Sequence, residues 1–252
     1  MPRLVDAPMA PVASMLESMR QRLGDGPVHG VRLDLDDTTG WVPASWLLHD
    51  DALLDDLLDA AKQRWSAQPH AAAALAWKCY TYWVALPALV GLVSTGRVPL
   101  PRPADILVQY ADRQPFLTVC PQPSEFAVLP GDALAGEPFA RVCADEDELL
   151  AQLRRTLLDE HLDPLLARLQ ERVNLGRRTL LGSLASGVSH ALIRAGAPLA
   201  LIARTVEALD VDDLVELSLR DDGGIHVQRR TCCLAFTLPE PRICTGCCIR
   251  PE

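Results

Sequence analysis

Five cysteines within seventeen positions constrain this 252-residue chain more than any other feature of its sequence. They are Cys232, Cys233, Cys244, Cys247 and Cys248, and the first four have the spacing C-C-x10-C-x2-C. Four thiolates that converge on one point form a metal site. The sequence therefore predicts a fold that brings two separate pairs of cysteines together.

Three kinds of site use four such cysteines. Structural zinc modules combine two C-x(2–4)-C pairs around a tetrahedral ion, and Cys244 with Cys247 has that form. Cys232 and Cys233 are adjacent, however, and neighbouring side chains on a strand point to opposite faces, so the chain must bend at Cys232. A [2Fe–2S] cluster is a wider, dinuclear target that four cysteines hold, and the spacing favours it. Zinc and thiol–disulfide chemistry remain open alternatives.

The same spacing resembles the C-terminal motif of the FhuF-like ferric-siderophore reductases, which carry a [2Fe–2S] cluster on it. The likeness extends from about Trp41 to the end of the chain, although only the cysteine motif is specific. The upstream segments that look similar are Glu160 to Leu165 (EHLDPL), Asn174 to Gly187 (NLGRRTLLGSLASG), Cys79 to Pro87 (CYTYWVALP) and Gly96 to Pro99 (GRVP).

Two features depart from the family pattern. The family has Trp-Gly-Asn where this chain has Leu181-Gly182-Ser183, so no role of that Trp or Asn is carried over. Cys248 is an additional thiol beside the motif.

The resemblance implies an oxidoreductase acting on ferric-siderophore complexes during iron assimilation. Cys232, Cys233, Cys244 and Cys247 are then the ligands of a [2Fe–2S] cluster, which passes one electron to Fe(III) and releases Fe(II). No G-x-G-x-x-G follows a predicted strand, so the electron donor is expected to be a separate ferredoxin or flavoprotein reductase. The competing functions are a zinc-stabilised binding or scaffold protein, and a [2Fe–2S] electron carrier or redox sensor without a substrate site.

The net charge of the chain limits the kinds of partner that it is expected to bind. The net charge of −9 and pI of about 5.1 argue against nucleic-acid binding and against an anionic membrane surface. The same acidity favours a neutral or cationic ferric trihydroxamate over an anionic triscatecholate. The first residues lack the apolar run of a signal peptide, so a cytoplasmic location is expected, with a peripheral position at the inner face of the membrane left open.

One segment, residues 71 to 93, is long enough to cross a bilayer but contains Lys78, Thr81 and Pro87. A lysine at mid-helix is expensive in lipid, so the segment predicts a core helix that is kinked or ends near Pro87, and no transmembrane segment is expected.

The predicted fold is α+β and mainly helical, with a small antiparallel hairpin that presents the cysteine loop. Residues 1–100 form an N-terminal α+β region and residues 101–252 a helical region with the hairpin and the [2Fe–2S]-binding loop, unless both belong to one continuous domain. Apolar periodicity and turn residues predict helices at 13–23, 50–65, 71–93, 145–158, 179–195 and 199–209, a further helix opened by Asp163-Pro164, and strands at 28–35, within 106–128, at 214–219 and at 225–229.

The sequence contains further candidate residues for the site. Arg229, Arg230 and Arg242 lie near the cysteines in sequence and would raise the potential of the cluster or contact a donor protein, unless they are simply solvated. Backbone N–H groups of Thr245 and Gly246 are candidate donors to sulfur. The weaker candidates are His161, which would face the substrate or play a structural part, His226, which would replace a thiolate, and five tryptophans that would line a cleft or fill the core (Trp41, Trp46, Trp65, Trp77, Trp83).

Overall fold

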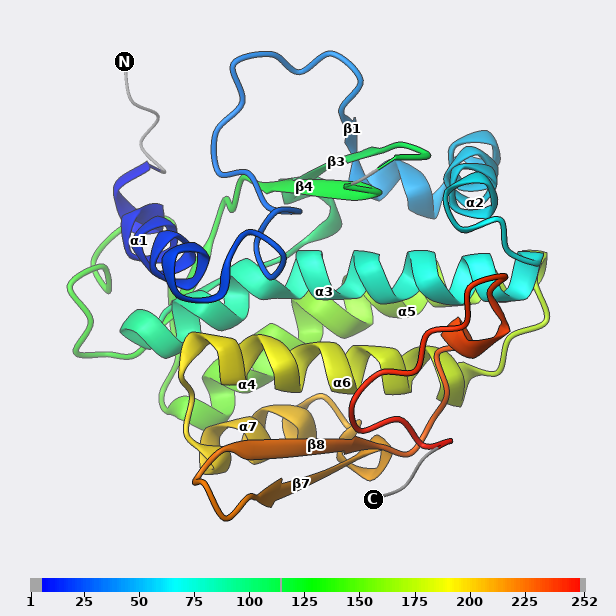
Figure 1. Cartoon of the computed structure of the whole chain (residues 1–252). Helices are drawn as coiled ribbons and strands as arrows, with labels where there is room; N and C mark the ends of the chain where they lie inside the picture. Colours follow the sequence, from blue (N-terminus) through cyan, green and yellow to red (C-terminus); the bar gives the residue numbers. More distant parts are fainter. Residues whose placement is uncertain (1–5, 114, 250–252) are drawn as a thin grey trace.

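A long central helix organises the protein. The computed structural model describes residues 6–113 and 115–249, and in it helix α3 (Pro69–Thr95) runs through the middle beside helix α6 (Arg177–Ala195) (Figure 1). Pro69 occupies the first turn, an alanine-rich stretch favours the helix, and Gly96 ends it in the left-handed conformation with φ of 70°. Side chains on nearly all faces of α3 are buried, which confirms the predicted core helix.

Of the two alternatives, a kink or an end near Pro87, the end is excluded because α3 continues to Thr95. Pro87 removes one backbone hydrogen bond, but the residues on both sides of it are buried on all faces, and that packing keeps the helix intact. Within the residues that the structure describes, no helix is both long enough and apolar enough to span a membrane.

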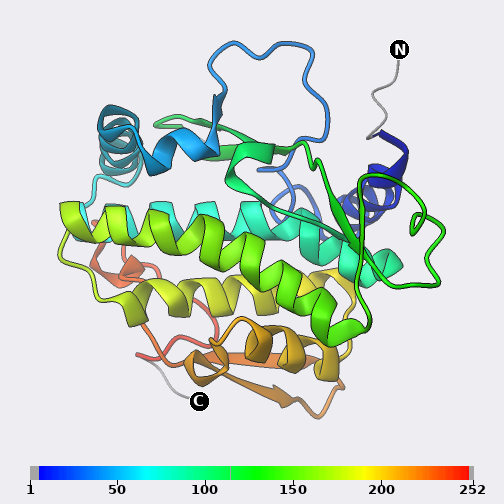
Figure 2. The same ribbon diagram turned by 180° about the vertical axis from the view of Figure 1, so that it is seen from behind.

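A second long helical element packs behind α3 and α6 (Figure 2). It consists of α4 (Glu146–Arg154), a π-helical segment (Arg155–Leu162) and α5 (Asp163–Arg172) without interruption. Asp145 caps its start by accepting a hydrogen bond from Glu148 N at 2.9 Å. Helix α5 begins at Asp163 with Pro164 in its first turn, which confirms the helix start predicted there, although it continues directly from the π-helical segment.

Helices α1 (Asp6–Leu23) and α2 (Asp51–Trp65) cover the opposite side of α3 together with small sheets (Figure 1). Each of the two three-stranded sheets combines one strand from residues 1–100 with two strands from residues 101–252. Their strand orders are β1 (Val42–Pro43), β3 (Ile106–Tyr110), β4 (Leu117–Pro121), all antiparallel, and β2 (Val98–Pro99), β5 (Phe126–Val128), β6 (Ala140–Val142), in which β5 and β6 are parallel.

The predicted strand at residues 28–35 does not form. Val31 makes only an isolated bridge to Val119. The preceding backbone is used in turns instead, because the N–H groups of Val28 and His29 both donate to Asp25 O. The alternation of apolar and polar residues over so short a segment does not outweigh the preference of the preceding residues for a turn.

The last elements form the platform for the cysteines. Helix α7 (Leu199–Ala208) leads to the antiparallel hairpin of β7 (Val215–Leu219) and β8 (Ile225–Arg229), in the register Val215 to Arg229. Strand β8 packs on α6 and runs directly into the cysteine segment (Figure 1). These elements confirm the predicted α+β, mainly helical class with a hairpin before the cysteines.

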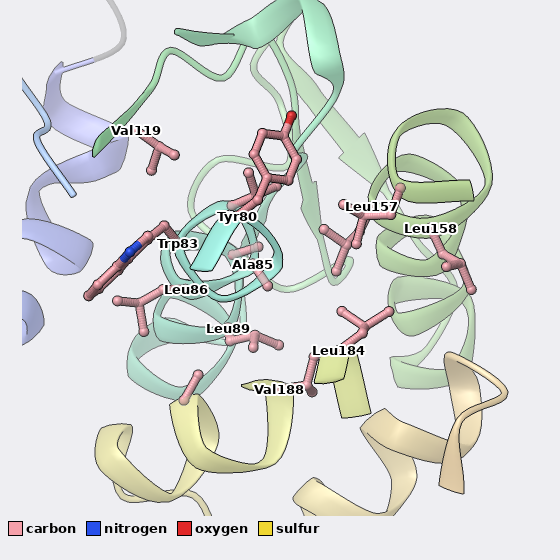
Figure 3. Packing of buried hydrophobic residues seen from close by; sticks show 14 of the residues in the cluster. Tyr80, Trp83, Ala85, Leu86, Leu89, Val119, Leu157, Leu158, Leu184 and Val188 are labelled. Atoms are coloured by element: carbon pink, nitrogen blue, oxygen red, sulfur yellow. The ribbon is translucent and has the colours of Figure 1, made fainter. Parts of the chain in front are cut away.

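The main core lies between the two helical layers. Leu89 of α3 lies near Leu184 and Val188 of α6, and Leu157 of the π segment belongs to the same cluster (Figure 3). Truncation of one such leucine to alanine costs about 2–5 kcal/mol in proteins generally. A separate small cluster of Leu75, Cys233, Ala235 and Leu238 attaches the cysteine segment to the N-terminal half of α3.

Candidate metal centre

The chain reaches the site through a close contact between α6 and the end of the hairpin. After β8 the chain bends at Arg230 and Thr231. Thr231 lies so close to Gly182 that a Cβ on this glycine would come within 1.8 Å of Thr231 Oγ1. The small residue that the sequence places on α6 therefore admits the cysteine segment rather than another helix.

The adjacent cysteines are followed by a tight turn. Leu234 adopts a left-handed φ of 62°, and residues Ala235–Thr237 form a 3-10 turn. Leu234 N donates to Cys232 Sγ at 3.3 Å, and the N–H of Ala235 donates to the Cys233 sulfur. The bend that the adjacent pair requires is thus formed, and backbone donors to sulfur come from the two residues after the pair.

The second pair lies on a turn that is attached to β8. Thr245 and Gly246 form the turn, and Gly246 has φ of 70°. Gly246 O accepts a hydrogen bond from Arg229 N at 2.8 Å, and a Cβ on Gly246 would lie 2.1 Å from Val227 O. Only glycine satisfies both the backbone conformation and this approach. These two contacts therefore fix the position of the turn along β8.

The thiols of the cysteine segment interact with one another in two groups. Cys233 and Cys244 share a hydrogen bond, which is the main cause that lowers the pKa of Cys233 and raises that of Cys244. Cys247 and Cys248 share another, while Cys232 interacts electrostatically with Cys233 and Cys247. The five thiols of the cysteine segment thus influence one another's pKa values in pairs.

Positive charge accompanies these sulfurs. Lys78 and Arg229 both favour the thiolate forms of Cys233 and Cys244. Arg229 is almost completely buried, with 3% of its surface exposed. Burial is the main cause that raises the pKa of Cys232, and this thiol would have to lose its proton to bind a metal.

The donor set suits iron or zinc, which both bind thiolate. Within residues 6–113 and 115–249, however, no group of three or more His, Cys, Asp or Glu side chains is gathered so as to hold a single metal ion. Cysteine thiolates are ligands both of a structural zinc ion and of a [2Fe–2S] cluster.

A cavity of about 600 Å³ adjoins the thiols. It lies between α3 and α6 and is bounded by the cysteine segment, with Cys233 and Cys244 in its wall. Trp65, Tyr82 and Trp83 contribute aromatic surface. Its size falls within the range of small-molecule sites.

Sequence reasoning missed most of the residues that the helices contribute to this cavity. Lys78 and Tyr82 lie one turn apart on α3, and Gly187, His190 and Arg194 share one face of α6. Lys78 was noted only as an interruption of an apolar helix. A lone lysine in such an apolar helix is a signal in the sequence that points to this cavity.

Several predicted candidates lie elsewhere or have structural partners. His161 is fully buried between Tyr80 and Pro101. Arg230 is exposed and pairs with Glu216 at 3.6 Å, whereas Arg242 lines the cavity. His226 lies on β8 with Nδ1 3.2 Å from an Arg220 nitrogen.

Some of the tryptophans line the cavity and others lie elsewhere. Trp77 is core, with Nε1 donating to Leu180 O at 2.7 Å, and Trp46 is exposed. Trp65 and Trp83 line the cavity, as some of the tryptophans were expected to do.

No protein-family model, curated protein or solved structure matches the chain. The resemblance to FhuF-like reductases therefore rests on the cysteine spacing and on the upstream segments quoted above.

Proposed function

We propose that this protein is a ferric-siderophore reductase whose [2Fe–2S] cluster is bound by Cys232, Cys233, Cys244 and Cys247. The observation that carries the proposal is the position of Cys233 and Cys244 in the wall of the 600 Å³ cavity. A ligand in this cavity contacts residues that would hold the cluster, so an electron has little protein to cross. The family resemblance supports the same reaction.

The chain's own groups prepare the site for reduction. When bound, the cluster supplies one electron at a time. The buried Arg229 and the N–H groups of Leu234 and Ala235 stabilise negative charge on the sulfurs. Since the reduced centre carries one more negative charge than the oxidised one, these groups raise its reduction potential.

The substrate changes in a balanced one-electron step. A siderophore holds Fe(III) tightly through hard oxygen donors and Fe(II) weakly. The reduced protein loses one electron, Fe(III) in the chelate becomes Fe(II), and the intact chelator releases it. A ferredoxin or flavoprotein reductase of the cytoplasm restores the electron.

The test compares two serine substitutions. Cys244→Ser removes a thiol that lies both in the motif and in the cavity wall, and we expect it to abolish the visible spectrum of the cluster and the reductase activity together. Cys248→Ser removes the thiol outside the motif and should retain both. Absorption and EPR spectra of anaerobically purified protein, with iron, sulfide and zinc assays, make the comparison.

Three results would contradict the proposal. Full activity of Cys244→Ser would exclude the assigned ligand set. Colourless wild-type protein with one zinc and no sulfide would indicate a structural zinc module. A protein with the cluster that fails to reduce any ferric chelate in a single turnover would be an electron carrier or redox sensor.

A further inference from the structure

The cavity beside the cysteines has a charge opposite to that of the whole chain. The protein carries a net charge of −9. Yet the cavity wall contains Lys78, Arg194, Arg229 and Arg242, and no aspartate or glutamate is among its lining residues. A concave surface of one sign concentrates the field inside it, so the potential there differs from that outside.

Among the described residues these cations have no carboxylate partner, and the anionic groups that Lys78 and Arg229 favour are the thiolate forms of Cys233 and Cys244. In the part of the chain that the structure describes, none of the four forms an ion pair with a carboxylate. Arg229 donates to Ser183 Oγ at 3.1 Å, but its buried Nε has no hydrogen-bond partner. An unpartnered donor on a buried guanidinium is costly, and an anionic oxygen is the group that satisfies it.

Arg194 is fixed by neutral partners. Its Nη1 donates to the Tyr82 hydroxyl at 2.7 Å, and its guanidinium carbon lies 5.3 Å from the centre of the Tyr82 ring. This contact orients the arginine without cancelling its charge. The same tyrosine packs edge-on against Trp83, so the cavity wall contains both cations and aromatic rings.

The pKa of His190 is sensitive to the positive charges that line the cavity. Its pKa is lowered to about 4, first by burial and then by the charges of Arg194, Lys78 and Arg229. The ring is therefore neutral near pH 7 and adds hydrogen-bonding capacity but no charge.

We propose that this cavity binds an anionic ferric chelate, in which iron is held by phenolate or carboxylate oxygens. This inference rests on the proposed function, and it specifies the substrate class. Lys78, Arg194 and Arg229 donate to the anionic oxygens, and Trp65, Tyr82 and Trp83 pack against the organic part, so an aromatic catecholate fits best. The overall acidity of the chain favoured a neutral or cationic trihydroxamate, and the local charge of the cavity argues for the opposite class.

Gallium(III) chelates test the inference without any redox chemistry, because Ga(III) resembles Fe(III) in size and charge but is not reduced. We would measure the affinity of the full-length protein for Ga(III) triscatecholate, Ga(III) citrate and a neutral Ga(III) trihydroxamate by tryptophan fluorescence and calorimetry. We expect both anionic chelates to bind at least about tenfold more tightly than the neutral one, with the triscatecholate the tighter of the two if the aromatic wall contributes. The affinity for the anions should fall as salt concentration rises.

The chain offers a matched pair of variants, because Lys62 and Lys78 are its only lysines. Lys78→Gln should weaken binding of the anionic chelates about tenfold or more. Lys62→Gln changes an exposed lysine on α2 that pairs with Asp59, and it should leave the affinity unchanged. Circular dichroism verifies that both variants fold, and the salt dependence of the wild-type protein tests the inference independently of them.

The outcomes separate this inference from the proposed function. Equal or tighter binding of the neutral chelate, or salt-independent binding of the anions, would overturn the inference, as would unchanged affinity in a folded Lys78→Gln variant. If the anions bind but the protein contains zinc and no sulfide, the anion site stands and the reductase function fails. If the cluster is present and only the neutral chelate binds, the reductase stands and the anionic substrate class fails.

Discussion

At the scale of single residues, His161 shows how the structure fixes a proton. Its Nδ1 lies 3.0 Å from the Pro101 carbonyl, which only accepts, so Nδ1 carries the hydrogen. Its Nε2 lies 2.6 Å from the Tyr80 hydroxyl and must then accept. The ring is neutral, and burial lowers its pKa to about 4.

This histidine should make stability depend on acid. Since the folded pKa is about 4 and the unfolded value is 6.5, its contribution is complete above pH 6.5 and is lost as the pH falls toward 4. Between pH 7.5 and pH 5 the loss is about 2 kcal/mol of the free energy of unfolding. Urea denaturation at both pH values measures it.

The His161→Gln variant is the control, because His190 titrates in the same direction and remains in both proteins. The variant should be less stable at pH 7.5 but lose about 2 kcal/mol less on acidification. Identical pH dependence of the variant and the wild-type protein would contradict the assignment.

Some residues of the site could be predicted from the sequence and others could not, depending on how close together they lie along the chain. The cysteines were predicted as candidate ligands because all four lie within sixteen positions and their spacing is itself the signal. Lys78 and Arg194 were not predicted, because more than a hundred residues separate them and only the packing of α3 on α6 brings them to one cavity. For His161, the buried environment that excludes a substrate-facing role is a tertiary property.

At the scale of secondary-structure elements, α6 is the support of the cysteine segment, and Gly182 is the point of contact. In a helix interior, alanine is usually better than glycine by about 1 kcal/mol. Here the added Cβ would meet Thr231 only 1.8 Å away, so we expect Gly182→Ala to displace the cysteine segment. Cluster content, measured by visible absorption, should fall severalfold while far-UV circular dichroism stays unchanged.

Gly187→Ala provides the matched control on the same helix. A Cβ at this position would have its nearest contact at 3.8 Å, in ordinary van der Waals range of Tyr82. This variant should retain the cluster and gain slightly in stability. Equal cluster content in the two variants would show that Gly182 does not position the segment.

Elements with long apolar periodicity were predictable, and short or interrupted ones were not. The hairpin and the helices of residues 51–65 and 177–195 follow their patterns closely. The prediction failed at residues 28–35, where turn hydrogen bonds replaced a strand, whereas the helix start predicted at Asp163-Pro164 is present and follows directly on a π-helical segment. The failure arises because alternation over a few residues is a weaker signal than the turn residues beside it.

At the scale of the whole molecule, two hydrophobic clusters of very different size hold the chain. The large one spans the helical layers, and the small one attaches the cysteine segment to α3 through Leu75, Cys233, Ala235 and Leu238. The body should therefore remain folded when the cluster is removed, whereas the cysteine segment should loosen.

Limited proteolysis with trypsin tests this division of stability. Arg242 is exposed between the two pairs of cysteines, and we expect cleavage after it to become severalfold faster once the cluster is removed by acid and chelator. Far-UV circular dichroism of the same sample should be nearly unchanged. Unfolding of the whole chain on metal removal would instead indicate a structural metal module.

The order of these parts along the chain has a consequence for biosynthesis. Lys78 on α3 and the whole of α6 precede Cys232 in the sequence. A ribosome adds roughly 5–20 residues per second, so Cys232 is added roughly 2–7 seconds after Ala195 completes α6. The two helices therefore have time to pair before any cluster ligand is translated, and the thiols reach a surface that already exists. If the protein holds the proposed cluster, its delivery would then be the last step of maturation rather than the nucleus of folding.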